Sequence, residues 1–196
     1  EEDLLASGNG KLRSVVELGA GTALVAIVAL QMFWKDLDCV FVTDHDPGTL
    51  EKAKNNHETT MEELYDQATT EEDQSVVLNE ISAVPFYFEE LKWGVEAEIK
   101  RLQHKIHGRL ETPQVDMIVG SDLIYCFENV DPLLLTVSKL LDRGQGVFLL
   151  SQSFAYDEET EQQIDLMSAK LGLERIVHAD TLGSKGGSKI QRFRFS

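Results

Sequence analysis

Short apolar runs alternate along this chain with longer stretches in which apolar residues recur at helical spacing. Seven segments have the pattern of strands: residues 14–18, 39–43, 84–89, 115–119, 146–151, 173–178 and 189–195. Strands buried on both faces of a parallel sheet are apolar throughout, and the runs at 14–18, 39–43 and 115–119 have this character.

Helical patterns occupy most of the intervals between these segments, and they are expected at residues 22–34, 47–56, 95–110, 131–143 and 157–172. The stretch 22–34 is apolar on nearly every face, so we expect that helix to be well buried. Residues 57–80 are polar and interrupt the alternation, with helical character only around Met61 to Ala68.

The alternation of strands and helices predicts an α/β fold whose sheet is covered on both faces. No helical stretch separates the last two strand segments, so we expect them to pair as an antiparallel hairpin. A chain of 196 residues is long enough for one domain with a sizeable core and too short for two full ones. We therefore expect a single domain with an insertion near residues 57–80.

Charge narrows the range of partners. The formal net charge is −16, and a nucleic-acid-binding protein needs a basic surface that is not evident here. No Lys or Arg occurs between Lys54 and Lys92, whereas ten Asp and Glu residues do. This acidic insertion is expected to be solvated or partly disordered. The alternative is that it attracts a basic protein substrate.

The sequence shows no membrane span, no signal-peptide pattern and no disulfide spacing, and this favours the cytoplasm or the nucleus as the compartment. The longest apolar run, residues 23–30, is too short to cross a bilayer, and residues 1–14 lack the pattern of a signal peptide. Cys39 and Cys126 have neither disulfide nor metal-ligand spacing, and no metal is expected. The first residue is Glu1 rather than Met, which leaves room for an upstream segment.

The first strand runs into a glycine turn that is suited to a ligand. Backbone can approach a ligand closely at Gly19 and Gly21, and the following helix presents free N–H groups. A dinucleotide-binding loop requires a glycine at position 24, which is Leu24, and the Gly-Lys-Ser/Thr of a phosphate-binding loop is absent. Acidic-x-Gly-x-Gly, which begins here at Glu17, is instead typical of S-adenosylmethionine sites. A turn without any ligand is the remaining alternative.

The end of the second strand supports the cofactor interpretation. A carboxylate at Asp44 is placed to accept hydrogen bonds from both ribose hydroxyls. Asp46 is the weaker competitor for this role.

Three motifs together make the chain resemble the methyltransferase-like protein-lysine methyltransferases, methyltransferase family 16. They are Val16-Glu-Leu-Gly-Ala-Gly-Thr22, Leu91-Lys-Trp-Gly94 and Asp116-Met-Ile-Val-Gly-Ser-Asp-Leu-Ile-Tyr125, the last with the family's Asp-x-x-Tyr signature. The resemblance implies a Rossmann-like three-layer sandwich with a seven-stranded, mostly parallel sheet. The chain departs from the family pattern at Ala23, where a third glycine is usual, and in lacking a tryptophan before the first motif.

The resemblance also implies roles for individual residues. The cofactor-binding residues are expected to be Glu17, Gly19, Ala20, Gly21, Asp44, Trp93 and Ser121, with Trp93 near the adenine. Asp122 and Tyr125 are expected to face the substrate as catalytic residues. On residue pattern alone, each of these three residues also has a purely structural alternative. Trp93 could be an ordinary core or surface aromatic, Asp122 a cap of the following turn, and Tyr125 a core residue.

The function implied is transfer of a methyl group from S-adenosylmethionine to lysine side chains of a non-histone protein, without nucleic acid or membrane partners. Methylation of a histidine, a protein N-terminus or a small molecule is the alternative within enzymes, because the fold does not decide the acceptor. A noncatalytic cofactor-binding or interaction protein is the alternative outside them.

Overall fold

Seven strands form one sheet at the centre of the molecule. The computed structural model describes residues 12–178 and 189–196. The strands are β1 (Ser14–Leu18), β2 (Cys39–Asp44), β3 (Phe86–Glu90), β4 (Met117–Ser121), β5 (Val147–Gln152), β6 (Leu173–His178) and β7 (Lys189–Phe195). Their order is β3-β2-β1-β4-β5-β7-β6. Only β7 runs antiparallel to its neighbours in the sheet, so the predicted mostly parallel sheet with an antiparallel C-terminal hairpin is confirmed.

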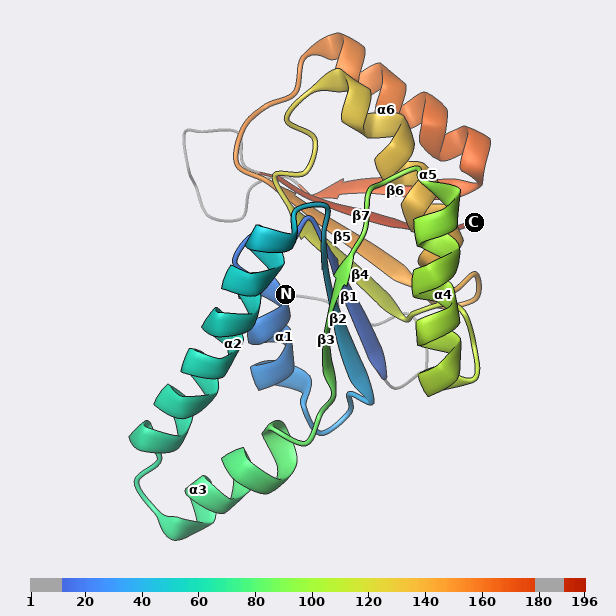
Figure 1. Ribbon diagram of the computed structural model, residues 1–196. Coiled ribbons are helices and arrows are strands. Elements are labelled where there is room, and N and C mark those ends of the chain that lie inside the picture. Colours follow the sequence, from blue (N-terminus) through green and yellow to red (C-terminus); the bar gives the residue numbers. More distant parts are fainter. Residues whose placement is uncertain (1–11, 179–188) are drawn as a thin grey trace.

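Helices cover both faces of this sheet. They are α1 (Leu24–Phe33), α2 (Pro47–Gln67), α3 (Glu71–Val76), α4 (Glu96–Leu110), α5 (Val130–Leu140) and α6 (Glu158–Leu171), with short turns η1 (Val77–Ile81) and η2 (Phe127–Asn129). Figure 1 shows α1 and α2 on one side of the sheet and α4, α5 and α6 on the other. The core is correspondingly divided into two clusters, one for each face. The three-layer α/β architecture is thus confirmed.

The predicted burial of the apolar face of α4 is confirmed, whereas α1 is less buried than expected. In α4 the buried side chains are Ile99, Leu102, Ile106 and Leu110. In α1, a stripe of Leu24, Val28 and Met32 is exposed although all three are apolar. The prediction of a well-buried helix is therefore wrong for this stripe, because the contacts of α1 with β1, β2, β4 and α2 leave these three side chains exposed among the described residues. Among the described residues, no helix is long and apolar enough to span a membrane.

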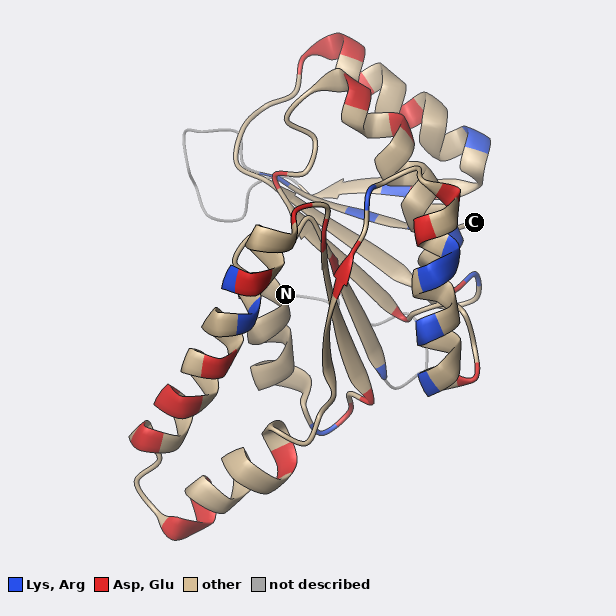
Figure 2. Cartoon of the chain, viewed as in Figure 1, with Lys and Arg blue, Asp and Glu red and all other residues tan. Residues whose placement is uncertain are grey.

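The acidic insertion is helical, which confirms the helix expected around Met61 to Ala68 and corrects the predicted end of the preceding helix. Helix α2 does not end at Asn56 but continues to Gln67, and α3 and η1 follow it. Its anchors to the sheet are apolar: the His57 ring stacks on Phe86 at 4.1 Å between centroids, and Val77 and Ile81 are buried. Acidic positions are spread along the resulting arm (Figure 2), and the residues at these positions are exposed. The insertion is solvated as expected, but it is not disordered.

Candidate active site

A pocket of about 460 Å³ opens at the carboxyl ends of β1, β2 and β4, where ligands bind in open α/β sheets. Its volume lies within the range of small-molecule sites, about 300–1,000 Å³. The lining residues are Gly19, Asp44, His45, Leu91, Lys92, Trp93, Ser121, Asp122, Leu123, Tyr125, Asn129 and Pro132. Six residues that the sequence singled out, five from the three family motifs and Asp44 from the end of β2, are therefore brought together here.

The loop after β1 has a backbone that favours glycine. Gly19 and Gly21 have φ angles of +57° and +54°, and Ala23 takes a similar value of +60°. A Cβ on Gly19 would stand 2.9 Å from Leu123 Cδ2 and 3.0 Å from Trp93 Cζ2, whereas one on Gly21 would meet open space. Ala23 therefore adopts the left-handed conformation for which the usual third glycine is suited.

Leu123 supports the floor of the pocket. Its side chain fills the space that a Cβ on Gly19 or on Gly120 would occupy. Sequence reasoning missed this residue. The signal that could have found it is Gly120, because a glycine inside a strand often marks a close approach of another group.

Glu17 supports the glycine loop from below and does not line the pocket. Its carboxylate is buried and accepts a hydrogen bond of 2.9 Å from the backbone N–H of Ala26, in the first turn of α1. Burial raises the pKa of Glu17 to about 7, although the N–H groups of Ala26 and Val25 act to lower it. The geometry thus gives Glu17 a role at the helix start, and direct contact with a cofactor stays a prediction.

Asp44 presents its carboxylate to the pocket from the end of β2. Its Oδ2 accepts from the N–H of Gly21 at 3.3 Å, and its Oδ1 accepts from the N–H of Asp46 at 3.1 Å. Asp46 instead caps α2, accepting from the N–H and the hydroxyl of Thr49, both at 2.8 Å. Of the two candidates for the ribose, only Asp44 lines the pocket.

Trp93 lies against Gly19 as part of the pocket wall, and the motif around it is fixed by α5. Gly94 has a φ of +75°, and a Cβ there would stand 2.9 Å from Pro132 Cβ. The N–H of Gly94 donates to Thr136 Oγ1 at 2.9 Å. The glycine of the Leu-x-Trp-Gly motif therefore permits close packing that holds the indole in place.

Asp122 and Tyr125 both reach the pocket, in different ways. Asp122 has a φ of +53°, and its carboxylate accepts from the N–H of Ser153 at 2.7 Å and from the Ser153 hydroxyl at 2.9 Å. Tyr125 is 71% exposed, so it does not pack in the core. Ser153 was missed from the sequence, because nothing in its neighbourhood distinguishes it from other residues at strand ends.

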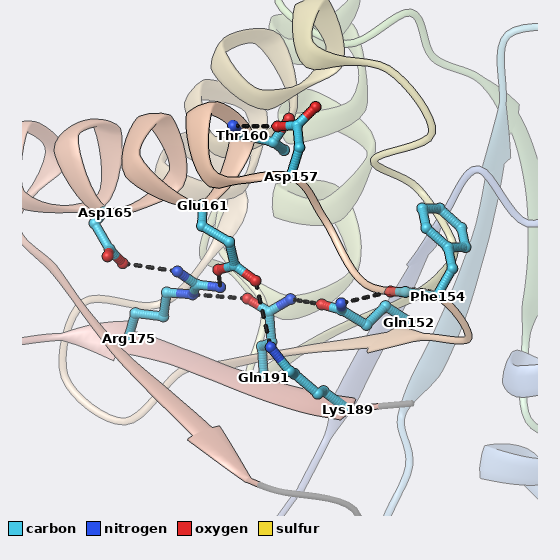
Figure 3. Close-up of polar contacts among 9 residues, drawn as sticks. All are labelled: Gln152, Phe154, Asp157, Thr160, Glu161, Asp165, Arg175, Lys189 and Gln191. Carbon is cyan, nitrogen blue, oxygen red and sulfur yellow. Dashed lines mark hydrogen bonds and ion pairs between the residues drawn. The ribbon is translucent and has the colours of Figure 1, made fainter. Parts of the chain in front are cut away.

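The loop that carries Ser153 is tied to the C-terminal hairpin by a buried polar chain (Figure 3). Gln152 donates to the carbonyl of Phe154 at 2.7 Å and accepts from the side-chain amide of Gln191. Gln191 accepts in turn from Arg175 Nε at 2.7 Å, and Arg175 is paired with Glu161. Both glutamines are buried, so each needs these hydrogen bonds to satisfy its side-chain amide.

The remaining predicted site residues lie close by. Ser121 lines the pocket, whereas Ala20 and Gly21 sit in the adjoining turn, where the N–H of Ala20 donates to the Thr43 carbonyl at 2.9 Å. His45 and Asn129 line the pocket as well and were not anticipated. Within the described residues, no group of three His, Cys, Asp or Glu side chains is arranged to hold a metal ion.

Similar solved structures are methyltransferases of diverse substrates. A methyltransferase from Pyrococcus furiosus shares 19% identity, with 93% of this chain and 76% of that chain covered and a TM-score of 0.58. A ribosomal protein L11 methylase from Lactobacillus delbrueckii shares 14% (93% and 70% covered, TM-score 0.55). An rRNA methyltransferase from Streptomyces viridochromogenes shares 13% (95% and 78% covered, TM-score 0.57). At these identities the likeness establishes the fold alone.

Comparison of the sequence with protein families is more specific than the comparison of folds. No curated protein matches the chain. Residues 2–169 match the family described as lysine methyltransferase, which is most of the chain. The pocket fits this family's cofactor, because a glycine turn and the buried carboxylate of Asp44, which accepts from the N–H of Gly21, lie together at a cavity of suitable size. The chain therefore belongs to the lysine methyltransferase family and is an S-adenosylmethionine-dependent methyltransferase.

Proposed function

We propose that the protein methylates lysine side chains of a non-histone protein. The observation that carries this proposal is the joint placement of Asp122 and Tyr125 at one pocket with the cofactor loop. The family match supports a lysine acceptor. The net charge of −16 disfavours RNA, the substrate of one of the structural neighbours, because its phosphates would be repelled.

The residues of the pocket divide into two groups by what they do. Gly19, Asp44 and Trp93 bind the cofactor, with the Asp44 carboxylate accepting from the ribose hydroxyls. When bound, S-adenosylmethionine would supply the methyl group of its sulfonium to the lysine nitrogen, with the electron pair of the broken carbon–sulfur bond staying on sulfur. Asp122 and Tyr125 orient the incoming amine, and such positioning can contribute several kcal/mol to catalysis.

The amine must be neutral to react, and a free lysine has a pKa of about 10.4. A partly dry pocket and a neighbouring cationic sulfonium both favour the neutral amine. The lysine proton passes to solvent before the transfer. Asp122 accepts hydrogen bonds from the amine and holds its lone pair toward the methyl carbon, so it acts by orientation and no strong base is required.

The acidic arm formed by the outer part of α2 and by α3 suits a basic protein substrate. Figure 2 shows acidic positions along both helices, and the sequence between Lys54 and Lys92 contains no Lys or Arg. Attraction of this kind raises the association rate and weakens as salt is added. We infer cytoplasm or nucleus as the compartment from the two free cysteines, Cys39 and Cys126.

The decisive experiment identifies the methylated atom. Protein extract is incubated with the enzyme and tritiated S-adenosylmethionine, the labelled protein is hydrolysed, and the amino acids are separated. Label in methyllysine supports the proposal. If this label is absent when Asp122→Ala replaces the wild-type enzyme, the methylation depends on the pocket that Asp122 lines. Label in methylhistidine, in an N-terminal residue or only in small molecules assigns another acceptor. If calorimetry shows cofactor binding but no transfer occurs to any acceptor, the protein is a noncatalytic cofactor-binding protein.

A further inference from the structure

A second, smaller cleft adjoins the cofactor pocket. It lies between the segment that follows β4 and the loop from β5 to α6, and its volume is about 140 Å³. Tyr125 lines both cavities, so they adjoin at this residue. None of the roles assigned so far uses this cleft.

The size of the cleft restricts what it can hold. Sites for small molecules and cofactors usually measure about 300–1,000 Å³. The cofactor pocket falls within this range and the cleft falls well below it. A nucleoside therefore does not fit, whereas a single extended amino-acid side chain does.

Aromatic rings form the walls. The rings of Phe154 and Tyr156 stand edge to face, with centroids 5.7 Å apart and an interplanar angle of 78°. Phe127 also lines the cleft. Ring faces at such an angle can cover methylene groups, and they attract a cation placed over them.

The charges around the cleft are predominantly negative. Asp157 lines it, and its carboxylate accepts from the N–H of Thr160 at 2.8 Å. Burial raises the pKa of Tyr156, and the charges of Asp122 and Glu161 add to that effect. Arg175 opposes them, but it is already paired with Glu161 and Asp165.

The Tyr156 hydroxyl itself is buried and has no hydrogen-bond partner within the described part of the chain. An unpartnered buried hydroxyl is costly, so its presence at this place calls for an explanation. A polar group that enters the cleft would provide one.

The wall is held in place before any ligand arrives. Asp122 bonds Ser153 at one end of the β5–α6 loop, and Gln152 bonds the Phe154 carbonyl beside it. At the other end, Asp157 caps α6 (Figure 3). A preformed cleft binds its ligand without the entropic cost of ordering a loop.

Building on the proposed function, we propose that this cleft is the acceptor channel and receives the extended side chain of a substrate lysine. The methylene carbons lie against the outer surface of the Phe154–Tyr156 pair, whose rings are in contact with each other. The amino group is directed past Tyr125 toward the cofactor pocket. The walls and charge of the channel thus select a flexible cationic side chain over a neutral or planar acceptor.

The test measures binding separately from activity. The probe is Nα-acetyl-lysine N-methylamide, observed by saturation-transfer NMR with and without S-adenosylhomocysteine, and the norleucine, histidine and adenosine analogues serve for comparison. Ala155→Trp places an indole in the cleft that Ala155 lines, and Ala155→Leu fills it less severely. Gln162→Trp adds the same bulk on the exposed face of α6 and is the matched control.

We expect the lysine probe to bind the wild-type protein and Gln162→Trp, and binding to weaken about tenfold or more in Ala155→Trp, which corresponds to about 1.4 kcal/mol. Calorimetry should show unchanged cofactor affinity in all variants. Unchanged probe binding in both Ala155 variants overturns the proposal, as does preference for the histidine or adenosine analogue. If the wild-type protein binds the probe but transfers no methyl group, the proposed function is contradicted and the channel is not, because probe binding is measured without turnover.

Discussion

The carboxylate of Asp122 accepts two hydrogen bonds from a single residue, Ser153, one from its backbone N–H at 2.7 Å and one from its hydroxyl at 2.9 Å. The two residues follow neighbouring strands, β4 and β5, which run parallel. Asp122 also has a left-handed backbone, with a φ of +53°. The pair therefore fixes a residue with a left-handed backbone at the lining of the cofactor pocket.

Removing the hydroxyl tests whether this fixation matters for catalysis. Ser153→Ala keeps the backbone donor and loses one hydrogen bond to a charged group, which is worth about 1.5–3 kcal/mol. We expect kcat to fall about tenfold or more while the Kd for S-adenosylmethionine stays unchanged. The matched control is Ser151→Ala, since Ser151 meets Asp122 only through its backbone carbonyl. Equal kcat values in the two variants would show that the Ser153 hydroxyl has no such role.

The charge of Asp122 is tested by a different pair of variants. Asp122→Asn preserves the shape of the side chain and tolerates the left-handed backbone, so the fold should be retained. We expect both Asp122→Asn and Asp122→Ala to bind cofactor normally and to lose most methyl transfer. Full methylation by Asp122→Ala with intact cofactor binding would remove Asp122 from the catalytic residues.

Asp44 should determine cofactor affinity and leave the chemical step alone. Asp44→Asn replaces a charged acceptor of the ribose hydroxyls, and hydrogen bonds to charged groups contribute about 1.5–3 kcal/mol. We therefore expect the Kd measured by calorimetry to rise about 10- to 100-fold. Asp46→Asn is the control, because Asp46 caps α2 outside the pocket lining. Similar Kd values for the two variants would contradict the assignment of Asp44 to the ribose.

The glycine loop offers a comparison between two neighbouring glycines. Gly19 and Gly21 have nearly equal φ angles, but a Cβ on Gly19 would press on Leu123 and Trp93, whereas one on Gly21 meets open space. Both alanine variants incur the left-handed backbone cost of about 1–2 kcal/mol. We expect Gly19→Ala alone to lose a further 1–3 kcal/mol or so from overpacking, measured by urea denaturation without cofactor. Equal losses would mean that Leu123 and Trp93 yield freely.

Much of this fold could be predicted from the hydrophobic pattern, because strands and helices that pack in the core have apolar residues at the spacing of their buried positions. Strands β6 and β7 lie where the pattern predicts them, and α4 buries its apolar face. The errors arise where tertiary contacts override composition. The polar stretch after Asn56 indicated helix only around Met61 to Ala68, yet stacking of His57 on Phe86 and burial of Val77 and Ile81 hold a longer helical arm against the sheet.

In the site too, features that depend on local sequence could be predicted, and features that depend on tertiary contacts could not. Residues in backbone-dependent motifs were predictable, because Gly19 and Gly94 occupy positions that other residues do not fit. Residues that act through contacts between distant segments were not. Ser153 and Asp122 are 31 positions apart, and only the parallel register of β4 and β5 brings them together.

The buried glutamine pair is expected to act on the acceptor side of the site only. Gln152→Leu leaves the Phe154 carbonyl and the Gln191 amide without their partners, at a cost of about 1–3 kcal/mol. We expect amide hydrogen exchange to quicken in residues 153–157 and the KM for the acceptor to rise, with cofactor Kd unchanged. Gln162→Leu, on the surface of α6, is the control. A change in cofactor Kd without faster exchange would contradict this positioning role.

The buried carboxyl of Glu17 should make stability depend on pH in a direction opposite to that of a salt-bridged acid. Burial raises its pKa from 4.5 in the reference state to about 7 in the folded protein. The folded protein therefore binds more protons than the unfolded chain between these values, and the free energy of unfolding falls as pH rises through that window. Because one pKa unit corresponds to about 1.4 kcal/mol, the whole fall amounts to about 3 kcal/mol. Below pH 4.5 both states are protonated, so this contribution to stability is then fully present.

Glu17→Gln removes the titration while keeping an oxygen that can accept from the N–H of Ala26. Other carboxyl groups titrate alike in the two proteins, so their contributions cancel when the variants are compared. We expect urea denaturation to show similar stabilities at pH 5 and a growing advantage of the glutamine variant toward pH 8, approaching about 3 kcal/mol. Glu159→Gln, at an exposed position of α6, should show no such trend. A constant difference between Glu17→Gln and the wild-type protein across this range would mean that the Glu17 carboxyl is already ionised at pH 5 in the folded state.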